Sequence, residues 1–166
     1  MKAILATAAA VSVIAMAAPA AAQVDASLGY SLTDAGDANL GAVTGRVGFR
    51  AGWLGAEGEA SLGAGSDDVG AAKVKLDSQW AVYGKAIAPV AENFDVFARV
   101  GYGESRVQTK LAGVESKNTD DSVNYGVGAE WFFDPNNGVR ADYTRHDFGK
   151  GGEDANVWGL SYVRKF

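Results

Sequence analysis

The stretch from residue 93 to residue 103 constrains the fold most strongly, because its side chains alternate between two chemistries. The apolar face carries Phe94, Val96, Ala98, Val100 and Tyr102, and the opposite face carries Asp95, Phe97, Arg99, Gly101 and Gly103. A period of two residues is typical of a β-strand, and the stretch has the roughly 9–11 residues that a tilted strand needs to cross a bilayer. It predicts either one strand of a membrane barrel or one strand of a half-buried soluble sheet.

The amino terminus predicts a cleavable signal peptide. It has a positively charged start, an apolar stretch over residues 3–18 and the small-residue end Ala20-Ala21-Ala22, which are the three parts of a secretory signal. We place the cut after Ala22, so that residues 1–22 are the signal peptide and residues 23–166 are one mature domain. An uncleaved membrane helix is the alternative, but the apolar run is short for a span of roughly 20 residues.

The mature chain has no cysteine to form stabilising disulfides and no apolar run long enough to span a membrane as a helix. Losing Lys2 with the signal peptide changes the formal net charge from −5 to −6, and the sequence contains no cysteine. An acidic chain with scattered basic residues is a poor candidate for nucleic-acid binding. Because no long apolar run remains, strands have to form any membrane span.

Eight segments of the mature chain repeat the alternation. They span residues 24–32, 42–53, 54–64, 74–88, 93–103, 123–133, 139–146 and 157–166. Every backbone N–H and C=O group in lipid must be paired within the protein, so strands cross a membrane only as a closed barrel. The sequence therefore predicts an all-β fold, an eight-stranded antiparallel up-and-down transmembrane β-barrel.

The links between these segments alternate in length. Short links fall at residues 52–55, 89–93 and 134–138, and longer ones at residues 33–39, 65–72, 104–122 and 149–156. Membrane barrels have short periplasmic turns and longer extracellular loops. We therefore expect both termini to be periplasmic and residues 104–122 to form the longest external loop.

Aromatic residues on the apolar faces follow the same map. Trp53, Phe94, Trp131, Phe133 and Phe166 fall at the short-turn end, and Tyr30, Tyr102, Tyr125 and Trp158 fall toward the loop end. Two girdles of aromatic side chains at the membrane interfaces would have this distribution.

The polar faces carry charges of both signs, which form the candidate site. They are Arg46, Arg50, Glu57, Glu59, Asp77, Lys85, Asp95, Arg99, Glu130, Arg140 and Asp142. Eight strands enclose an interior just wide enough for side chains, and charge is tolerated there only when it is paired. We expect interlocking ion pairs that plug the lumen. The alternative is a narrow ion-conducting path, gated by exchange of pairs.

Several parts of the sequence together carry a family resemblance. They are the signal peptide, the eight alternating segments, residues 93–102 and 138–148, and the terminal Ser161-Tyr162-Val163-Arg164-Lys165-Phe166. The whole mature chain resembles the OmpA/OmpX-like family of eight-stranded outer-membrane β-barrels, which includes porin-like and opacity-like proteins. The resemblance implies a monomeric integral protein of the cell outer membrane with an envelope-stabilising or surface-interaction role. It also implies contacts with outer-membrane lipid and lipopolysaccharide, and a barrel-assembly machinery that reads Phe166 as the assembly signal.

Two further function classes are open. Some eight-stranded outer-membrane barrels resemble acyl-transferring enzymes, and His146 shares a face with Asp142 as a base shares one with its orienting carboxylate. No serine lies beside His146 in a nucleophile motif, and the sequence has neither cysteine nor a histidine cluster for a metal. We therefore expect no catalytic, cofactor or metal site. The second class is a soluble periplasmic lipid carrier, which would keep its apolar face inside.

The longer links are rich in acidic residues. They contain Asp34, Asp37, Asp67, Asp68, Glu115, Asp120, Asp121, Glu153 and Asp154, against Lys110, Lys117 and Lys150. We interpret these charges as solvated surface. The functional alternative is calcium or magnesium bridging to anionic lipopolysaccharide, because hard cations prefer oxygen ligands. The sequence names no surface ligand or solute.

Overall fold

The computed structural model describes residues 23–35, 38–65, 67–69, 72–111, 114–149 and 154–166. The predicted signal peptide, residues 1–22, lies outside this part of the chain. Among the described residues, no helix is long and apolar enough to cross a membrane.

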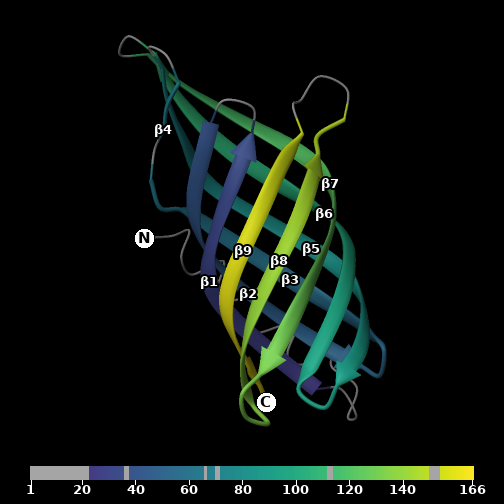
Figure 1. The fold of residues 1–166 in the computed structure, drawn as a ribbon. Helices are drawn as coiled ribbons and strands as arrows, with labels where there is room; N and C mark the ends of the chain where they lie inside the picture. Colours follow the sequence, from purple (N-terminus) through teal and green to yellow (C-terminus); the bar gives the residue numbers. More distant parts are fainter. Residues whose placement is uncertain (1–22, 36–37, 66, 70–71, 112–113, 150–153) are drawn as a thin grey trace.

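The described chain forms one closed antiparallel sheet. Its strands are β1 (Gln23–Ala35), β2 (Ala38–Ala51), β3 (Leu54–Gly63), β4 (Asp67–Val69), β5 (Ala72–Ala91), β6 (Phe94–Leu111), β7 (Val114–Phe132), β8 (Asn137–Asp147) and β9 (Ala155–Lys165). Strand β3 pairs with β5, the short β4 is attached to β5, and β9 pairs with β1. The remaining pairs join consecutive strands, so eight strands close into the ring seen in Figure 1. The predicted eight-stranded barrel is confirmed.

The alternation in sequence decides which side chains face outward. On β6, Val100 and Tyr102 are 60% and 45% exposed, whereas Arg99 is 3% exposed. The same pattern holds around the ring, so leucine, valine and aromatic side chains cover the outer wall while charged and hydroxyl side chains fill the lumen. A soluble lipid carrier would show the reverse arrangement, so that alternative is wrong.

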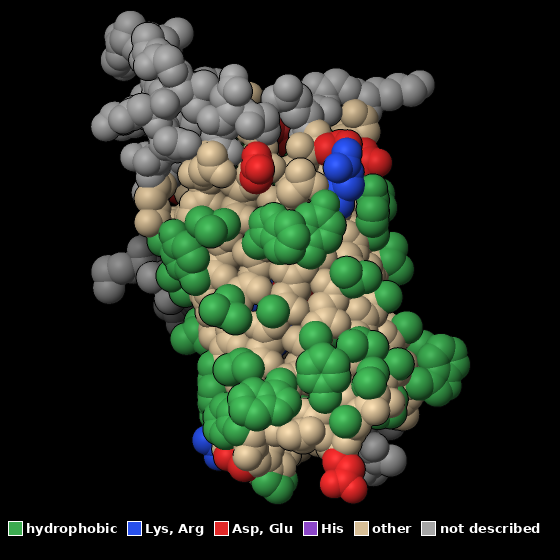
Figure 2. All heavy atoms as spheres, in the orientation of Figure 1, with side chains coloured by type: hydrophobic (Ala, Val, Ile, Leu, Met, Phe, Trp, Pro, Cys, Tyr) green, Lys and Arg blue, Asp and Glu red, His purple; other side chains and the backbone are tan. Residues whose placement is uncertain are grey.

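Hydrophobic side chains cluster on the outer wall in two zones, and charged side chains lie near the two ends in the same view (Figure 2). Exposed aromatic side chains at the short-turn end include Trp53, Trp131, Phe133 and Phe166, and those toward the other end include Tyr30, Tyr102, Tyr125 and Trp158. Phe94 is half-buried at the start of β6. This distribution matches the two predicted girdles, because such bands of aromatic residues lie at the two membrane interfaces.

Tight links define one end of the barrel, which we call the short-turn end. They consist of residues 52–53, 92–93 and 133–136. Gly52 has a φ of 67°, a left-handed conformation that favours glycine. In the third link, Asp134 Oδ1 accepts hydrogen bonds from the backbone N–H groups of Asn136 at 2.9 Å and Asn137 at 2.8 Å.

The first and last strands also meet at the short-turn end. The backbone N–H of Phe166 donates a hydrogen bond of 2.8 Å to the carbonyl of Val24. From there β1 and β9 pair continuously from Asp25↔Lys165 to Asp34↔Asn156. The seam between the two strands therefore begins directly beside the carboxyl terminus.

The opposite end, which we call the loop end, differs from the expected pattern. Strands β6 and β7 stay paired out to Leu111↔Val114, so residues 104–122 extend a β-hairpin and do not form the long polar loop that the sequence predicts. Figure 1 shows this hairpin and the adjoining end of β5 projecting past the other strands. Residues 33–39 are also mostly strand, because β1 and β2 pair out to Ala35↔Ala38. A strand beyond the bilayer has no lipid-facing side, so it lacks the apolar alternation that reveals strands in sequence.

A β-bulge in β5 overturns one predicted lumen residue. The pairing between β5 and β6 shifts between Leu76 and Ser78, which makes Asp77 the inserted residue. Asp77 is exposed, and Leu76 faces inward and is 3% exposed, the reverse of the prediction. A bulge changes the phase of the alternation, and a strict period of two cannot anticipate it.

Candidate functional site in the barrel lumen

The structure places ten of the predicted charged residues in the lumen, all except Asp77. They are Arg46, Arg50, Glu57, Glu59, Lys85, Asp95, Arg99, Glu130, Arg140 and Asp142. Each side chain reaches the lumen because it occupies an inward position of its strand, and neighbouring strands bring the charges to similar heights.

Glu57 on β3 lies at the centre of these charges because it contacts cations from three other strands. Its carboxylate is 3.2 Å from Lys85 Nζ on β5 and 2.8 Å from Arg99 Nη1 on β6. Arg140 on β8 donates to both carboxylate oxygens, the two-pronged geometry that makes arginine–carboxylate pairs strong. Glu57 therefore connects four strands across the lumen.

Arg99 is the converse case, one cation among three carboxylates. Besides Glu57, its Nη1 lies 3.0 Å from Glu59 Oε2, and its Nη2 lies 2.8 Å from Asp142 Oδ2. Its Nε donates a hydrogen bond of 3.0 Å to Thr144 Oγ1. Every edge of the guanidinium therefore has an acceptor, which is what burial of a charge requires.

The remaining charges complete a neutral group. Arg46 lies 2.6 Å from Glu59, Arg140 lies 3.0 Å from Asp142, and Lys85 lies 3.3 Å from Glu130. We call the connected set the lumen charge cluster; its cations are Arg46, Lys85, Arg99 and Arg140, and its carboxylates are Glu57, Glu59, Glu130 and Asp142. Four positive and four negative groups give it a formal charge of zero.

A second, smaller group of charges lies toward the short-turn end. Arg50 Nη1 is 2.7 Å from Asp95 Oδ2, and Lys165 Nζ is 3.8 Å from the same oxygen. The ammonium of Lys165 also lies 3.3 Å from the ring centroid of Phe132, a cation–π contact. The Arg50 side chain is 20% exposed, so this pair is closer to solvent than the lumen charge cluster.

Aromatic rings separate the cations, and sequence reasoning did not include them in the site. Phe97 lies between Lys85 Nζ at 4.5 Å and Arg140 Cζ at 4.4 Å, measured to the ring centroid. A Cβ atom on Gly128, the residue opposite Phe97 on β7, would lie 2.4 Å from that ring. The sequence does carry a signal for such a ring: a large aromatic residue on an otherwise polar face, with a glycine on the neighbouring strand that the ring can cover.

Tyr83 has the same relationship with Arg99 and Gly101. The Arg99 guanidinium lies 4.3 Å from the Tyr83 ring centroid. Tyr83 pairs with Gly101, where a Cβ atom would lie 2.7 Å from the ring. Both inward rings therefore need a glycine on the neighbouring strand to fit into the lumen.

Neutral polar groups replace charges nearer the loop end. The hydroxyl groups of Ser31, Thr44 and Ser61 form a chain across β1, β2 and β3, with oxygen–oxygen distances of 2.7 and 2.8 Å. On β7, the Ser122 hydroxyl donates to Asn124 Oδ1 at 2.7 Å. These contacts satisfy polar groups that are almost completely buried.

His146 also lies in this part of the lumen and is 2% exposed. The oxygens of Asp142 face the arginines Arg46, Arg99 and Arg140. The base-and-orienter pair considered from sequence therefore does not form. Within the described residues, no group of three or more His, Cys, Asp or Glu side chains is arranged to hold a metal ion.

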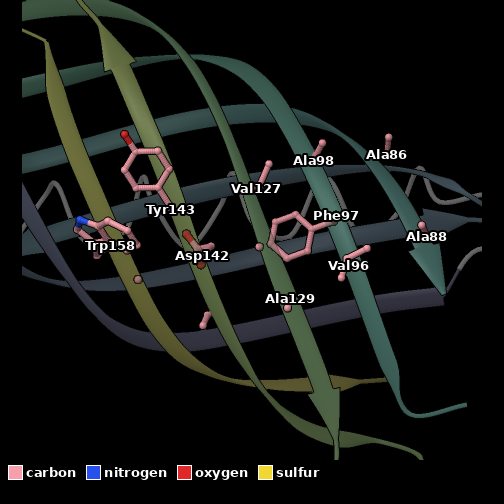
Figure 3. Close-up of a pocket in the computed structure, with 13 residues that line it drawn as sticks. Ala86, Ala88, Val96, Phe97, Ala98, Val127, Ala129, Asp142, Tyr143 and Trp158 are labelled. Carbon is pink, nitrogen blue, oxygen red and sulfur yellow. The ribbon is translucent and has the colours of Figure 1, made fainter. Parts of the chain in front are cut away.

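The outer wall has a hollow of about 710 Å³ over β5 to β9. Figure 3 shows that small side chains, among them Ala86, Ala88 and Ala98, lie on one side of it, with Tyr143 and Trp158 on the other. The hollow is lined mainly by apolar groups on the face that carries the aromatic girdles. Such a surface suits hydrocarbon chains and offers little to a polar substrate.

The lumen charge cluster can do two things physically. It can hold strands from opposite sides of the barrel in register, because one-sided loss of a buried pair leaves an uncompensated charge. It can also fill the interior, which in an eight-stranded barrel is only wide enough for side chains.

A model of the outer membrane protein beta-barrel domain matches residues 3–166 of the chain. A search among curated protein sequences found no match.

Solved structures of small membrane barrels are similar to this fold. Ail, the attachment invasion locus protein of Yersinia pestis, is 15% identical with a TM-score of 0.67, over 87% of this chain and 98% of that chain. The N-terminal β-barrel domain of Pseudomonas aeruginosa OprF is 12% identical with a TM-score of 0.64, over 85% and 96%. Neisserial surface protein A is 14% identical with a TM-score of 0.63, over 88% and 96%. At these identities the likeness concerns the fold.

Proposed function

The chain belongs to the outer membrane protein beta-barrel family, and on that premise we propose that it is a structural or surface-interaction protein whose lumen is plugged. It is a small integral barrel of the bacterial outer membrane, surrounded by lipid. The proposed role is to stabilise the envelope or to present a surface to a partner, and not to transport a solute.

The observation that carries the proposal is the closed, neutral lumen charge cluster. Its side chains are between 0% and 9% exposed, and each one contacts at least one partner of opposite charge. An ion passing through would have to separate such pairs, and breaking a buried pair costs about 3–5 kcal/mol. This supports a plug over the alternative of a narrow conducting path.

A surface-interaction role is supported by the hairpin of β6 and β7. Its strands stay hydrogen-bonded from Phe94↔Trp131 to Leu111↔Val114. Residues beyond Arg106 on β6 and before Val123 on β7 are not needed to close the barrel, because β3 pairs with β5 only as far as Leu62↔Ser78, opposite Arg106, and β8 pairs with β7 only from Val123↔Asp147 onward. A rigid extension of this kind holds polar groups away from the membrane surface, where a partner can reach them.

We further propose that the short-turn end faces the periplasm and the loop end faces outward. The short links and the position of Phe166 support this orientation, because bacterial outer-membrane barrels have their short turns on the periplasmic side. In this orientation the loop end meets lipopolysaccharide, Phe166 is available to the barrel-assembly machinery, and the barrel acts as a monomer.

The proposal assigns no enzymatic activity to the barrel. The carboxylate of Asp142 is held by arginines, and no serine hydroxyl among the described residues is hydrogen-bonded to His146. Acyl transfer by a nucleophile, a base and an orienting carboxylate needs those groups in contact.

Planar-bilayer recording tests the plug. The refolded wild-type barrel should show little conductance, and Arg99→Ala should conduct little more, because the other seven side chains of the lumen charge cluster remain. Arg106→Ala, at an exposed side chain paired with Glu104, is the matched control. Large, steady wild-type channels would refute the plug, and a clear rise in conductance for Arg99→Ala alone would favour the gated path.

A further inference from the structure

We propose that the loop end of the lumen is a binding site for a small, uncharged, mostly apolar molecule with one hydrogen-bonding group. The site lies above the lumen charge cluster and shares none of its residues. The lumen charge cluster plugs the barrel without any contribution from this cavity, so the proposed site is independent of the plug.

The cavity has a volume of about 320 Å³ and lies between the ends of the strands. Its walls include the apolar side chains of Leu40, Leu76 and Val107, and its polar lining includes Gln79, Ser105 and His146. Small-molecule sites have this composition, a mostly apolar pocket of roughly 300–1,000 Å³ with a few convergent polar groups.

The apolar wall is unusual inside a polar lumen. Leu40, Ala42 and Leu76 form a buried apolar cluster, and Val107 packs against it. The β-bulge at Asp77 is what turns Leu76 inward, because regular alternation would put Asp77 there instead. Bulges commonly redirect a side chain next to a functional site, and this one replaces a carboxylate with an apolar surface.

The polar groups of the cavity supply an independent observation. His146, Gln79 and Ser105 are 2%, 7% and 5% exposed, and no hydrogen bond to their side chains is found among the described residues. Among the described residues, the side-chain polar atoms that have no hydrogen-bond partner and are also fully sealed are the hydroxyl oxygens of Ser27 and Ser161, so the unpartnered atoms of His146, Gln79 and Ser105 are not fully sealed. Their free donors and acceptors therefore face the cavity.

Nearly buried polar groups without a partner normally bind something, either ordered water or a ligand. The described lining contains no lysine or arginine, and its one carboxylate is the exposed Asp120. An anion would find no counter-charge there, so the lining favours an uncharged ligand. The volume suits a molecule of one or two fused rings.

Indole is a suitable probe because it is uncharged, bicyclic and carries one N–H donor. His146 is the only histidine in the sequence, so its imidazole nitrogen signals can be assigned without ambiguity in an NMR spectrum of the refolded barrel in phospholipid nanodiscs. Titration with indole should shift these signals along a saturable curve. Indole-3-acetate, the same ring with a carboxylate, should bind at least about tenfold more weakly, a difference of about 1.4 kcal/mol.

Filling the cavity provides the control that separates binding from dissolution of indole in the lipid. Leu76→Trp and Val107→Trp each place a large ring in the cavity, and either variant that folds should lose the saturable shift. Leu160→Trp, at an outward side chain that is 66% exposed, should keep it. A linear shift in the wild type, an unchanged curve in a folded cavity-filled variant, or no shift at all would overturn the proposal and leave ordered water as the cavity's content.

Discussion

Replacing Arg99 by methionine tests whether the lumen charge cluster stabilises the barrel. Methionine keeps much of the side chain that packs on Tyr83 but removes the charge that contacts Glu57, Glu59 and Asp142. The Arg99 side chain is 1% exposed, so solvent cannot replace the lost contacts. Removing one partner from a buried ion pair costs about 3–5 kcal/mol.

The structure favours the lower end of that range. Each carboxylate that Arg99 contacts keeps another cation: Glu57 keeps Lys85 and Arg140, Glu59 keeps Arg46, and Asp142 keeps Arg46 and Arg140. No carboxylate is left alone, although the cluster acquires a net charge of −1. We therefore expect Arg99→Met to lower the free energy of unfolding by about 3 kcal/mol.

Two further variants give this prediction its controls. Arg106→Met removes a pair whose arginine side chain is 59% exposed, so the cost should be at most about 1 kcal/mol. The double variant Arg99→Met/Glu59→Gln restores neutrality and should be more stable than simple addition of the two single effects predicts, with a coupling of about 1–2 kcal/mol.

Urea unfolding in detergent micelles, followed by tryptophan fluorescence, measures these differences. The four tryptophans of the sequence, Trp53, Trp80, Trp131 and Trp158, all lie on the outer wall, so their emission reports transfer from detergent to water. The ion-pair argument is refuted if Arg99→Met costs no more than Arg106→Met, or if the double variant is strictly additive.

The other predictions concern orientation, closure and a turn. In whole cells, a membrane-impermeant maleimide should label Asn118→Cys but not Asn136→Cys, because the first lies at the loop end and the second at the short-turn end; the opposite pattern would invert the orientation. Deleting Phe166 should lower the fraction of heat-modifiable, assembled barrel in the outer membrane without affecting export, because the N–H of Phe166 begins the β1–β9 seam; normal assembly would exclude a role for this residue. Hydrogen bonds from the backbone N–H of Asn136 and then from Asn137 lower the pKa of Asp134 below its usual 3.8. The ionised Asp134 carboxylate therefore stabilises the folded barrel at pH values above its unfolded-state pKa, and this contribution is lost as the pH falls through its lower folded-state pKa. Asp134→Ala should lower the unfolding midpoint at neutral pH and have no effect in strong acid; a difference that stays constant across pH would contradict this.

Sequence alone predicted the features that follow from alternation and closure. A period of two assigned Arg99 and Arg140 to the lumen and Val100 to the outer wall, because successive side chains of a strand point to opposite faces. The ring of eight strands followed from the need to pair every backbone group in lipid.

The remaining features depend on strand stagger and on local defects in the sheet. Glu57 meets Arg140 across the lumen, and the relative height of β3 and β8 is set by the shear of the closed barrel, which no single strand encodes. The bulge at Asp77 was missed because it changes the phase of alternation, and residues 104–122 were misread because strands outside the bilayer carry no such signal. The apolar cavity follows from both effects together, since Leu76 enters it through the bulge and Val107 lies on the hairpin.

Because the β1–β9 seam begins beside Phe166, the two ends of the barrel domain lie next to each other. The ends of β1 and β9 are joined by a backbone hydrogen bond of 2.8 Å. With residues 1–22 removed, as the sequence predicts, a short linker could connect the two ends as an additional turn of the same kind as the others at that rim. Termini that lie close together on the surface are the usual condition for circular permutation. The barrel has no structurally distinct first strand, and a permuted chain opened at the loop end would carry both of its termini on the opposite side of the membrane.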